Sequence, residues 1–248
     1  LFDTNGDGEI DVDPNLTKLN QFINEARAQG MYVNLSFETY NVGGGGVPPA
    51  FFDRYPEAQA VNYSGALAVD NEYGTGKKIP SIFNQDYLRV SRNFIKNVLK
   101  KVDTSQILYY ETTVEPQYIG NQHLDYSDSA RQAYLAAGGS WKPDKGDDHW
   151  NNFRAKSLAD WVDGDALAIK EIAGQDALIA VDYLEAQRME NRNGNSIVFL
   201  DKLNQANIIQ VNWHWDFDRG YNNVNRFAAE KNWAITEHMT LPGDWNPD

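Results

Sequence analysis

Segments with a helical spacing of apolar residues alternate along the chain with short runs of β-branched and aromatic residues. This alternation constrains the fold more than any other feature of the sequence. The runs that have the length and composition of buried strands are 31–38, 107–114, 177–184, 208–215 and 233–239. Helical patterns precede or separate them, at 16–26, 87–99, 153–169, 197–203 and 223–231. Because strands that alternate with helices form parallel sheets, we predict the α/β fold class.

The number of strands bears on the architecture. The chain has 248 residues, close to the size of one (β/α)8 barrel of the TIM type, and no linker or repeat divides it. We therefore predict one barrel domain over residues 1–248. A full barrel has eight strands, whereas the sequence shows five, which we number as strands 3 to 7. The barrel is then incomplete in this chain, as in a fragment of a longer chain. A five-stranded open sheet that is complete in itself is the alternative.

The composition excludes several classes of function. The net charge of −13 argues against nucleic-acid and anionic membrane partners, because phosphate binding requires a basic face. No apolar run approaches the roughly 20 residues that span a bilayer. The absence of cysteine excludes disulfides and thiolate chemistry, and the four histidines lack a zinc-site spacing. The compartment is not determined; we expect an extracellular or periplasmic location in preference to the cytoplasm.

Two glutamates lie at the ends of predicted strands and are the best candidates for chemistry. Glu115 follows the run 107–114, and Glu237 lies near the end of the run 233–239. A β/α barrel places its active site at the carboxyl ends of its strands. Retaining glycoside hydrolases need two carboxylates about 5 Å apart. We therefore predict Glu115 as the acid/base and Glu237 as the nucleophile. A glutamate that is merely hydrogen-bonded in a loop at a strand end is the alternative.

Further polar and aromatic residues surround these positions. Glu111 shares a strand face with Glu115 because the offset is even; it could contact sugar, tune the pKa of Glu115 or bind buried polar partners. Glu38 ends the first strand with the same ambiguity. Aromatic rings can stack on sugars, although packing explains Trp213 and Trp215 equally well. The predicted substrate-binding residues are Tyr40, Phe51, Glu111, Trp141, Trp150, Asp182, Tyr183, Trp213, His214, Trp215, His238 and Trp245.

The acidic segment 3–14 matches most of an EF-hand-like calcium loop. Gly8 permits the sharp turn, and the twelfth position is Pro14 instead of a bidentate glutamate. We expect a structural calcium site, with an Asx-rich turn without metal as the alternative. The predicted ligands are Asp3, Asn5, Asp7, the Glu9 carbonyl and Asp11. No organic cofactor is expected.

Several motifs resemble those of known glycoside hydrolases. Residues 114–116 resemble the Asn-Glu-Pro signature of clan A, with Val114 in place of the asparagine that binds the sugar 2-hydroxyl in that clan. The segment 237–247 is similar to the sequence after the nucleophile in glycoside hydrolase family 42, the β-galactosidase group. The loop 48–52 and the helix 153–161 also resemble segments of that family.

The resemblance implies a retaining β-glycosidase that hydrolyses β-linked glycosides or polysaccharides by a two-glutamate double displacement, with carbohydrate as its partner. The string 70–74 copies the residues around the acid/base of family 42. It falls in a loop without a preceding strand, so we interpret Glu72 as a loop or subsite residue. The substitution at Val114 leaves open a barrel that binds sugar without cleaving it. A calcium-stabilised structural module is the third possibility.

Overall fold

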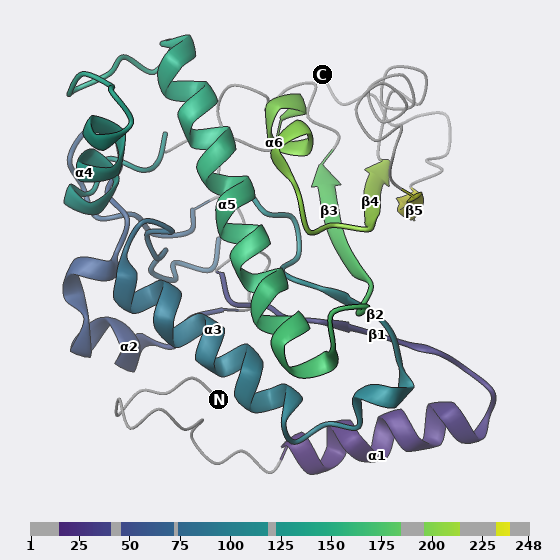
Figure 1. Cartoon of the computed structure of the whole chain (residues 1–248). Helices are drawn as coiled ribbons and strands as arrows, with labels where there is room; N and C mark the ends of the chain where they lie inside the picture. The colour runs from purple at the N-terminus through teal and green to yellow at the C-terminus, as the bar shows by residue number, and fades with distance from the viewer. Residues whose placement is uncertain are drawn as a thin grey trace, which may run out of the picture.

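A computed structural model of the chain describes residues 15–40, 46–71, 74–118, 123–184, 196–213 and 232–238. Its centre is a five-stranded parallel sheet in the order β1-β2-β3-β4-β5 (Figure 1). The strands are β1 (Val33–Ser36), β2 (Ile107–Glu111), β3 (Ile179–Leu184), β4 (Ile208–Trp213) and β5 (Asn232–His238). Each lies within or overlaps a predicted run, so the predicted α/β class with a parallel sheet is confirmed.

The order of the strands distinguishes a doubly wound open sheet from a barrel. Every strand pairs with its neighbours in the sequence, so the order in the sheet is the order in the chain. A doubly wound open sheet reverses its order at a switch point, whereas consecutive strands of a barrel do not. The order observed here is therefore the one that a barrel produces.

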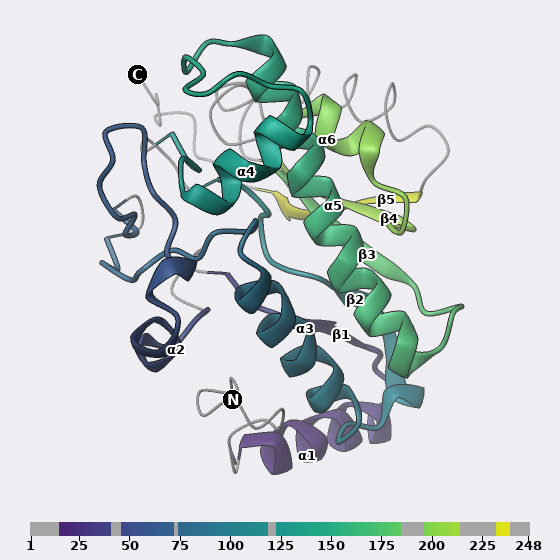
Figure 2. The ribbon, with the colours of Figure 1, turned by 60° about the vertical axis from the view of Figure 1, so that its left-hand side comes forward.

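Helices cover one face of the sheet (Figures 1 and 2). The α-helices are α1 (Asn15–Ala28), α2 (Pro49–Arg54), α3 (Gln85–Leu99), α4 (Asp128–Ala136), α5 (Asp148–Ala173) and α6 (Ile197–Lys202), and two short 3-10 helices are η1 (Pro56–Ala58) and η2 (Thr104–Gln106). Helices α3 and α5 lie side by side, joined by the ion pairs Arg92–Asp165 at 3.2 Å and Lys96–Glu171 at 2.5 Å.

The helix boundaries follow from local chemistry. Helix α3 begins after Asn84, whose side chain accepts the Tyr87 N–H, and α5 begins after Asp147, whose side chain accepts the Trp150 N–H. Gly174 ends α5 with a φ of 103°, a conformation that favours glycine. The predicted helix at 223–231 lies outside the described residues.

The two faces of the sheet differ in polarity. Val33 and Leu35 of β1 are buried, whereas Asn34 and Ser36 are exposed. Buried apolar residues of the sheet pack with Trp161 and Ile169 of α5 in the main hydrophobic core. The strand period of two therefore directs apolar side chains toward the helices and polar ones toward the opposite face.

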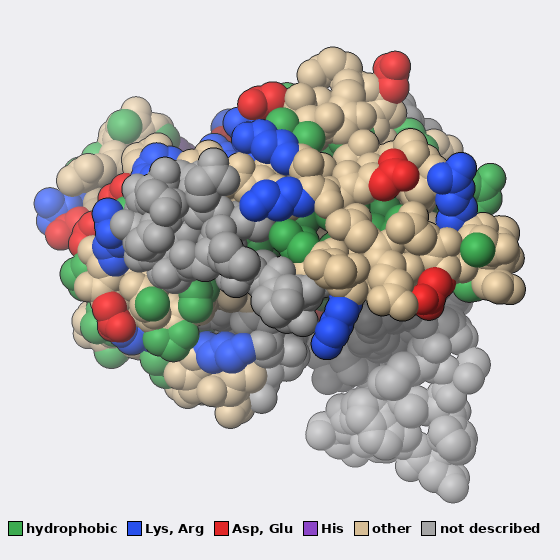
Figure 3. Space-filling view, turned by 90° about the horizontal axis from the view of Figure 1, so that it is seen from below, with side chains coloured by type: hydrophobic (Ala, Val, Ile, Leu, Met, Phe, Trp, Pro, Cys, Tyr) green, Lys and Arg blue, Asp and Glu red, His purple; other side chains and the backbone are tan. Residues whose placement is uncertain are grey.

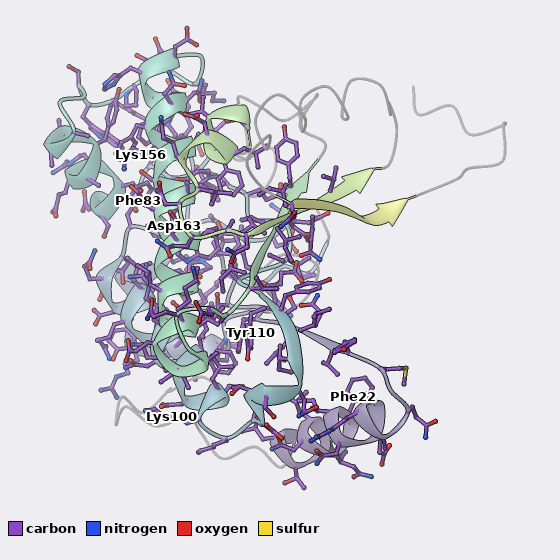
Figure 4. The ribbon with its side chains drawn as sticks, turned by 45° about the vertical axis from the view of Figure 1, so that its right-hand side comes forward. Phe22, Phe83, Lys100, Tyr110, Lys156 and Asp163 are labelled. Carbon is purple, nitrogen blue, oxygen red and sulfur yellow. The ribbon has the colours of Figure 1, made fainter. Side chains whose placement is uncertain are left out.

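The surface of the molecule is mixed. Basic, acidic and hydrophobic side chains are interspersed on the face seen in Figure 3, and Phe22 of α1 is an exposed ring (Figure 4). Among the described helices, none combines the length and the apolar character needed to cross a membrane.

Candidate active site

The carboxyl ends of the first three strands bring four carboxyl groups together. Glu38 follows β1 by two residues, Glu111 is the last residue of β2, and Asp182 lies on β3. Glu115 belongs to the bend that follows β2. The parallel pairing of β1, β2 and β3 is what brings these positions, far apart in the sequence, to one edge of the sheet.

Asp182 and Glu111 form a buried acid pair. Their carboxyl groups are hydrogen-bonded to each other, and both residues are almost completely buried. A hydrogen bond between two carboxyl groups requires a shared proton. Burial first, and then the charge of Glu111, raise the pKa of Asp182 to about 9. The pair therefore retains a proton at neutral pH.

Glu38 is a second protonated acid next to the pair. Burial raises the pKa of Glu38 to about 8, although its hydrogen bonds oppose the shift. Its Oε1 atom accepts the Tyr40 N–H at 3.0 Å and the Thr113 hydroxyl at 3.4 Å. At neutral pH these carboxyl groups therefore carry less negative charge than they would if all of them were ionised.

Glu115, on the bend after β2, is more accessible than Glu111 at the end of the strand. Its side chain is only half-buried, whereas Glu111 is buried. Its main-chain N–H donates to Asp182 Oδ2 at 3.3 Å, and its φ of 46° lies in the left-handed region. The prediction that the strand runs to residue 114 was wrong: β2 ends at Glu111, because the chain bends over 112–115. The half-buried carboxyl group of Glu115, which a bound molecule can reach, is therefore positioned by this bend.

Glu237 lies near the carboxyl end of β5, where its main chain is in register with Asn212 of β4. His238 ends the strand in register with Trp213. The side chains of these four residues lie outside the described part of the structure. The backbone accordingly puts Glu237 at the same edge of the sheet as Glu38 and Asp182.

Two site residues were missed by the sequence analysis. Gln210 of β4 is buried and donates to the Tyr109 hydroxyl at 3.5 Å. Burial, Glu111 and Asp182 together raise the pKa of Tyr109. An even offset of two residues from Glu111 would have indicated that Tyr109 shares its face.

Three predicted sugar contacts lie in the interior. The ring of Tyr40 packs 5.2 Å from that of Trp161, and the ring of Phe51 lies 5.3 Å from that of Phe52. Tyr40, Phe51 and Tyr183 are at most 1% exposed and belong to the main hydrophobic core. The structure therefore gives these aromatic residues packing positions in the core.

Trp150 and Trp141 belong to a second hydrophobic cluster around Tyr126 and Tyr134. Trp150 is buried, with its ring 4.8 Å from that of Tyr134. Trp141 is half-buried at the edge of the cluster, 5.6 Å from the Tyr126 ring. Trp150 has a packing position, and Trp141 keeps part of its surface free for contact.

Other predicted positions fall outside the described residues. His214, Trp215, Trp245 and the calcium-loop residues Asp3, Asn5, Asp7, Glu9 and Asp11 are among them. In the part of the chain that the structure describes, no group of three or more His, Asp or Glu side chains could hold a metal ion. Of the string 70–74, Asp70, Asn71 and Gly74 lie in a loop outside the five-stranded sheet, whereas Glu72, the residue that the prediction concerned, lies outside the described residues.

The calcium loop leads to a direct prediction. If residues 3–14 bind calcium, a tenfold excess of the ion over its Kd will raise the free energy of unfolding by about 1.4 kcal/mol. Differential scanning calorimetry with calcium and with a chelator measures this effect. The double variant Asp3→Asn/Asp7→Asn should lose it, because two charged ligands are removed. Equal melting temperatures of the wild type in both buffers would eliminate the metal site.

Comparison with known proteins identifies the fold. A parallel sheet in chain order, with acids at the carboxyl ends of its strands, is an arrangement of the β/α class of folds. The structure is similar to three β-galactosidases, from the psychrophilic Marinomonas ef1 (TM-score 0.59, 11% identity), Bacillus circulans sp. alkalophilus (0.57, 13%) and Rahnella sp. R3 (0.52, 12%). No family model matches the sequence, and no curated protein matches it.

The similarity extends over most of this chain and over about a third of each β-galactosidase. The matches cover 78%, 85% and 79% of this chain, but only 32%, 34% and 31% of the three β-galactosidases. The chain thus spans about a third of their length. At this identity the likeness shows a shared fold, which confirms the predicted resemblance to β-galactosidases at the level of structure.

Proposed function

We propose that the protein is a retaining β-glycosidase, similar to β-galactosidases, that hydrolyses β-linked glycosides or polysaccharides. The observation that carries this proposal is the group of carboxyl groups at the carboxyl ends of adjacent parallel strands, on a fold shared with β-galactosidases. Glu115 after β2 and Glu237 on β5 are the two carboxylates of the reaction.

The five strands are then strands 3 to 7 of a (β/α)8 barrel. Their parallel pairing in chain order is the pairing that five consecutive barrel strands have. Glu115 follows the fourth barrel strand and Glu237 lies on the seventh. Both stand at the end of the barrel where active sites of this fold are located.

The proposed reaction has two steps. Glu237 attacks the anomeric carbon while Glu115 protonates the oxygen of the departing group, which leaves a covalent glycosyl-enzyme. Glu115 then removes a proton from the water that hydrolyses this intermediate, and Glu237 departs. The sugar is released with the configuration that it had in the substrate.

The electrostatics of the site favour an uncharged ligand rich in hydroxyl groups. Glu38 and the Asp182–Glu111 pair hold protons at neutral pH, so they present donors as well as acceptors. Tyr109 and Gln210 add a hydroxyl and an amide on the same side. A carbohydrate matches this set of groups better than a cation or a phosphate does.

One observation favours a second candidate function. Val114 has no side-chain hydrogen-bonding group, so the contact that clan A makes with the sugar 2-hydroxyl is absent or is supplied elsewhere. A barrel that binds carbohydrate without cleaving it is consistent with that loss. A calcium-stabilised structural module, suggested only by residues 3–14, is a third candidate.

A panel of chromogenic β-glycosides tests the proposal, with the matching α-glycosides as controls. We expect cleavage of at least one β-glycoside, no cleavage of its α-anomer, and a first product with retained configuration by NMR. Binding of a sugar in calorimetry without cleavage of any substrate would instead support the carbohydrate-binding candidate. Inversion at the anomeric carbon would contradict the double displacement.

A further inference from the structure

The bend that carries Glu115 is held from both sides by carboxyl groups of neighbouring strands. On the β1 side, Glu38 accepts the Thr113 hydroxyl at 3.4 Å and also interacts with the Val114 N–H. On the β3 side, Asp182 Oδ2 accepts the Glu115 N–H at 3.3 Å. Successive main-chain groups of the bend are thus bound to opposite neighbours.

The conformation of Glu115 explains why such support is needed. A glutamate with a φ of 46° lies in a region that costs a non-glycine residue about 1 kcal/mol or more. Such a conformation persists only where the surrounding structure holds it. Asp182 is almost fully buried, so water competes poorly for its hydrogen bond to the Glu115 N–H.

We propose that Asp182 and Glu38 are positioning residues that orient Glu115 for proton transfer to the leaving group. The inference rests on the proposed function, because it assigns these acids a role in that reaction. Both act on Glu115 by holding the bend that carries it, and the carboxyl group of Glu115 transfers the proton.

The acid pair on β2 and β3 completes the arrangement. Glu111 hydrogen-bonds to Asp182, and its own carbonyl oxygen accepts the Phe37 N–H at 3.0 Å. The orientation of Asp182 is thereby tied to β2 as well as to β3. Since proton transfer is sensitive to sub-ångström changes in geometry, loosening this support should slow the acid step more than it weakens binding.

Leaving-group dependence tests the inference. In Asp182→Ala, kcat/KM for an alkyl β-glycoside should fall by about 10²-fold, because departure of an alkoxide depends on a positioned acid. With the dinitrophenyl glycoside of the same sugar, which leaves without protonation, kcat/KM should fall by less than about fivefold, because kcat/KM reports the first step and Glu115 acts as a base only in the second. Asp182→Asn keeps an acceptor oxygen and should restore kcat/KM for the alkyl glycoside to within about tenfold of the wild type.

Asp163→Ala is the matched control. Asp163 lies on α5 (Figure 4), is nearly as buried, and accepts the main-chain N–H groups of Asn204 at 2.8 Å and Gln205 at 2.9 Å. Asp163→Ala should lower the melting temperature because, like Asp182→Ala, it removes a buried carboxyl group that accepts main-chain N–H groups. The ratio of the kcat/KM values for the alkyl and dinitrophenyl glycosides should nevertheless stay that of the wild type.

Hydrogen exchange gives a readout that does not depend on activity. The Glu115 amide should be protected in the wild type and should exchange at least about tenfold faster in Asp182→Ala. An unprotected Glu115 amide in the wild type would overturn the inference whatever the kinetics show. A wild type that cleaves no glycoside refutes the proposed function and the catalytic role with it. If the wild type is active but the two kcat/KM values fall equally in Asp182→Ala, the positioning role alone is refuted.

Discussion

Glu237→Gln is expected to lower kcat by about 10⁴-fold or more, and Glu115→Gln by about 10²- to 10⁴-fold with a poor leaving group. The first substitution removes the group that forms the covalent intermediate, so neither step of the reaction can proceed. The second removes the proton donor of the first step, whose absence lowers kcat/KM less when the leaving group is already stable as an anion, and it removes the base of the second step with either substrate. Values of kcat and kcat/KM on alkyl and dinitrophenyl glycosides measure these effects.

Azide separates the two roles. In Glu237→Gly, azide enters the space left by the side chain, displaces the leaving group and gives the α-glycosyl azide. In Glu115→Ala, azide attacks the glycosyl-enzyme, displaces Glu237 and gives the β-glycosyl azide. The exposed Glu25 of α1 provides a control, because Glu25→Gln should change kcat by less than about twofold. If either site variant kept more than a tenth of wild-type activity on the alkyl glycoside, its assigned role would be wrong.

The free energy of unfolding should fall as the pH rises from about 5 to 8. Burial raises the pKa of Asp182 to about 9 and that of Glu38 to about 8, whereas unfolded carboxyl groups titrate near pH 4. Between these values the folded protein keeps protons that the unfolded chain has released. Each such group lowers stability by about 1.4 kcal/mol per pH unit, and the loss is complete once the pH passes the folded pKa.

Urea denaturation at several pH values, compared with the variant Asp182→Asn, isolates one of these groups. The amide does not titrate, so stability of the variant should fall less steeply, by about 1.4 kcal/mol per unit. Asp165, whose pKa burial raises to about 7 despite the nearby Arg92, contributes to the slope in both proteins. Its contribution therefore cancels in the comparison. Parallel curves for the two proteins would show that Asp182 is ionised in the folded state.

Local sequence patterns predicted where the strands lie better than they predicted the residues at which the strands end. The run 107–114 is rich in β-branched and aromatic residues throughout, yet β2 stops at Glu111. The left-handed φ of Glu115 is supported by a hydrogen bond to Asp182, a residue 67 positions away. Local periodicity in the sequence cannot predict such a long-range contact. The same limit applies to the aromatic residues. Tyr40 and Trp141 are of the same chemical type, but only packing makes the first a core residue and leaves the second at an edge.

The sequence by itself determined the α/β class, the parallel sheet and the position of Glu115 close to the end of a strand. Periodicity and strand-terminal carboxylates are local properties, so a single chain displays them. The tertiary structure decided which acids meet and what charge they carry. Glu38, Glu111 and Asp182 come from three strands, and their proton affinities depend on burial and on one another. Burial and the interactions between these acids exist only once the strands are paired, and therefore only the folded chain defines the site.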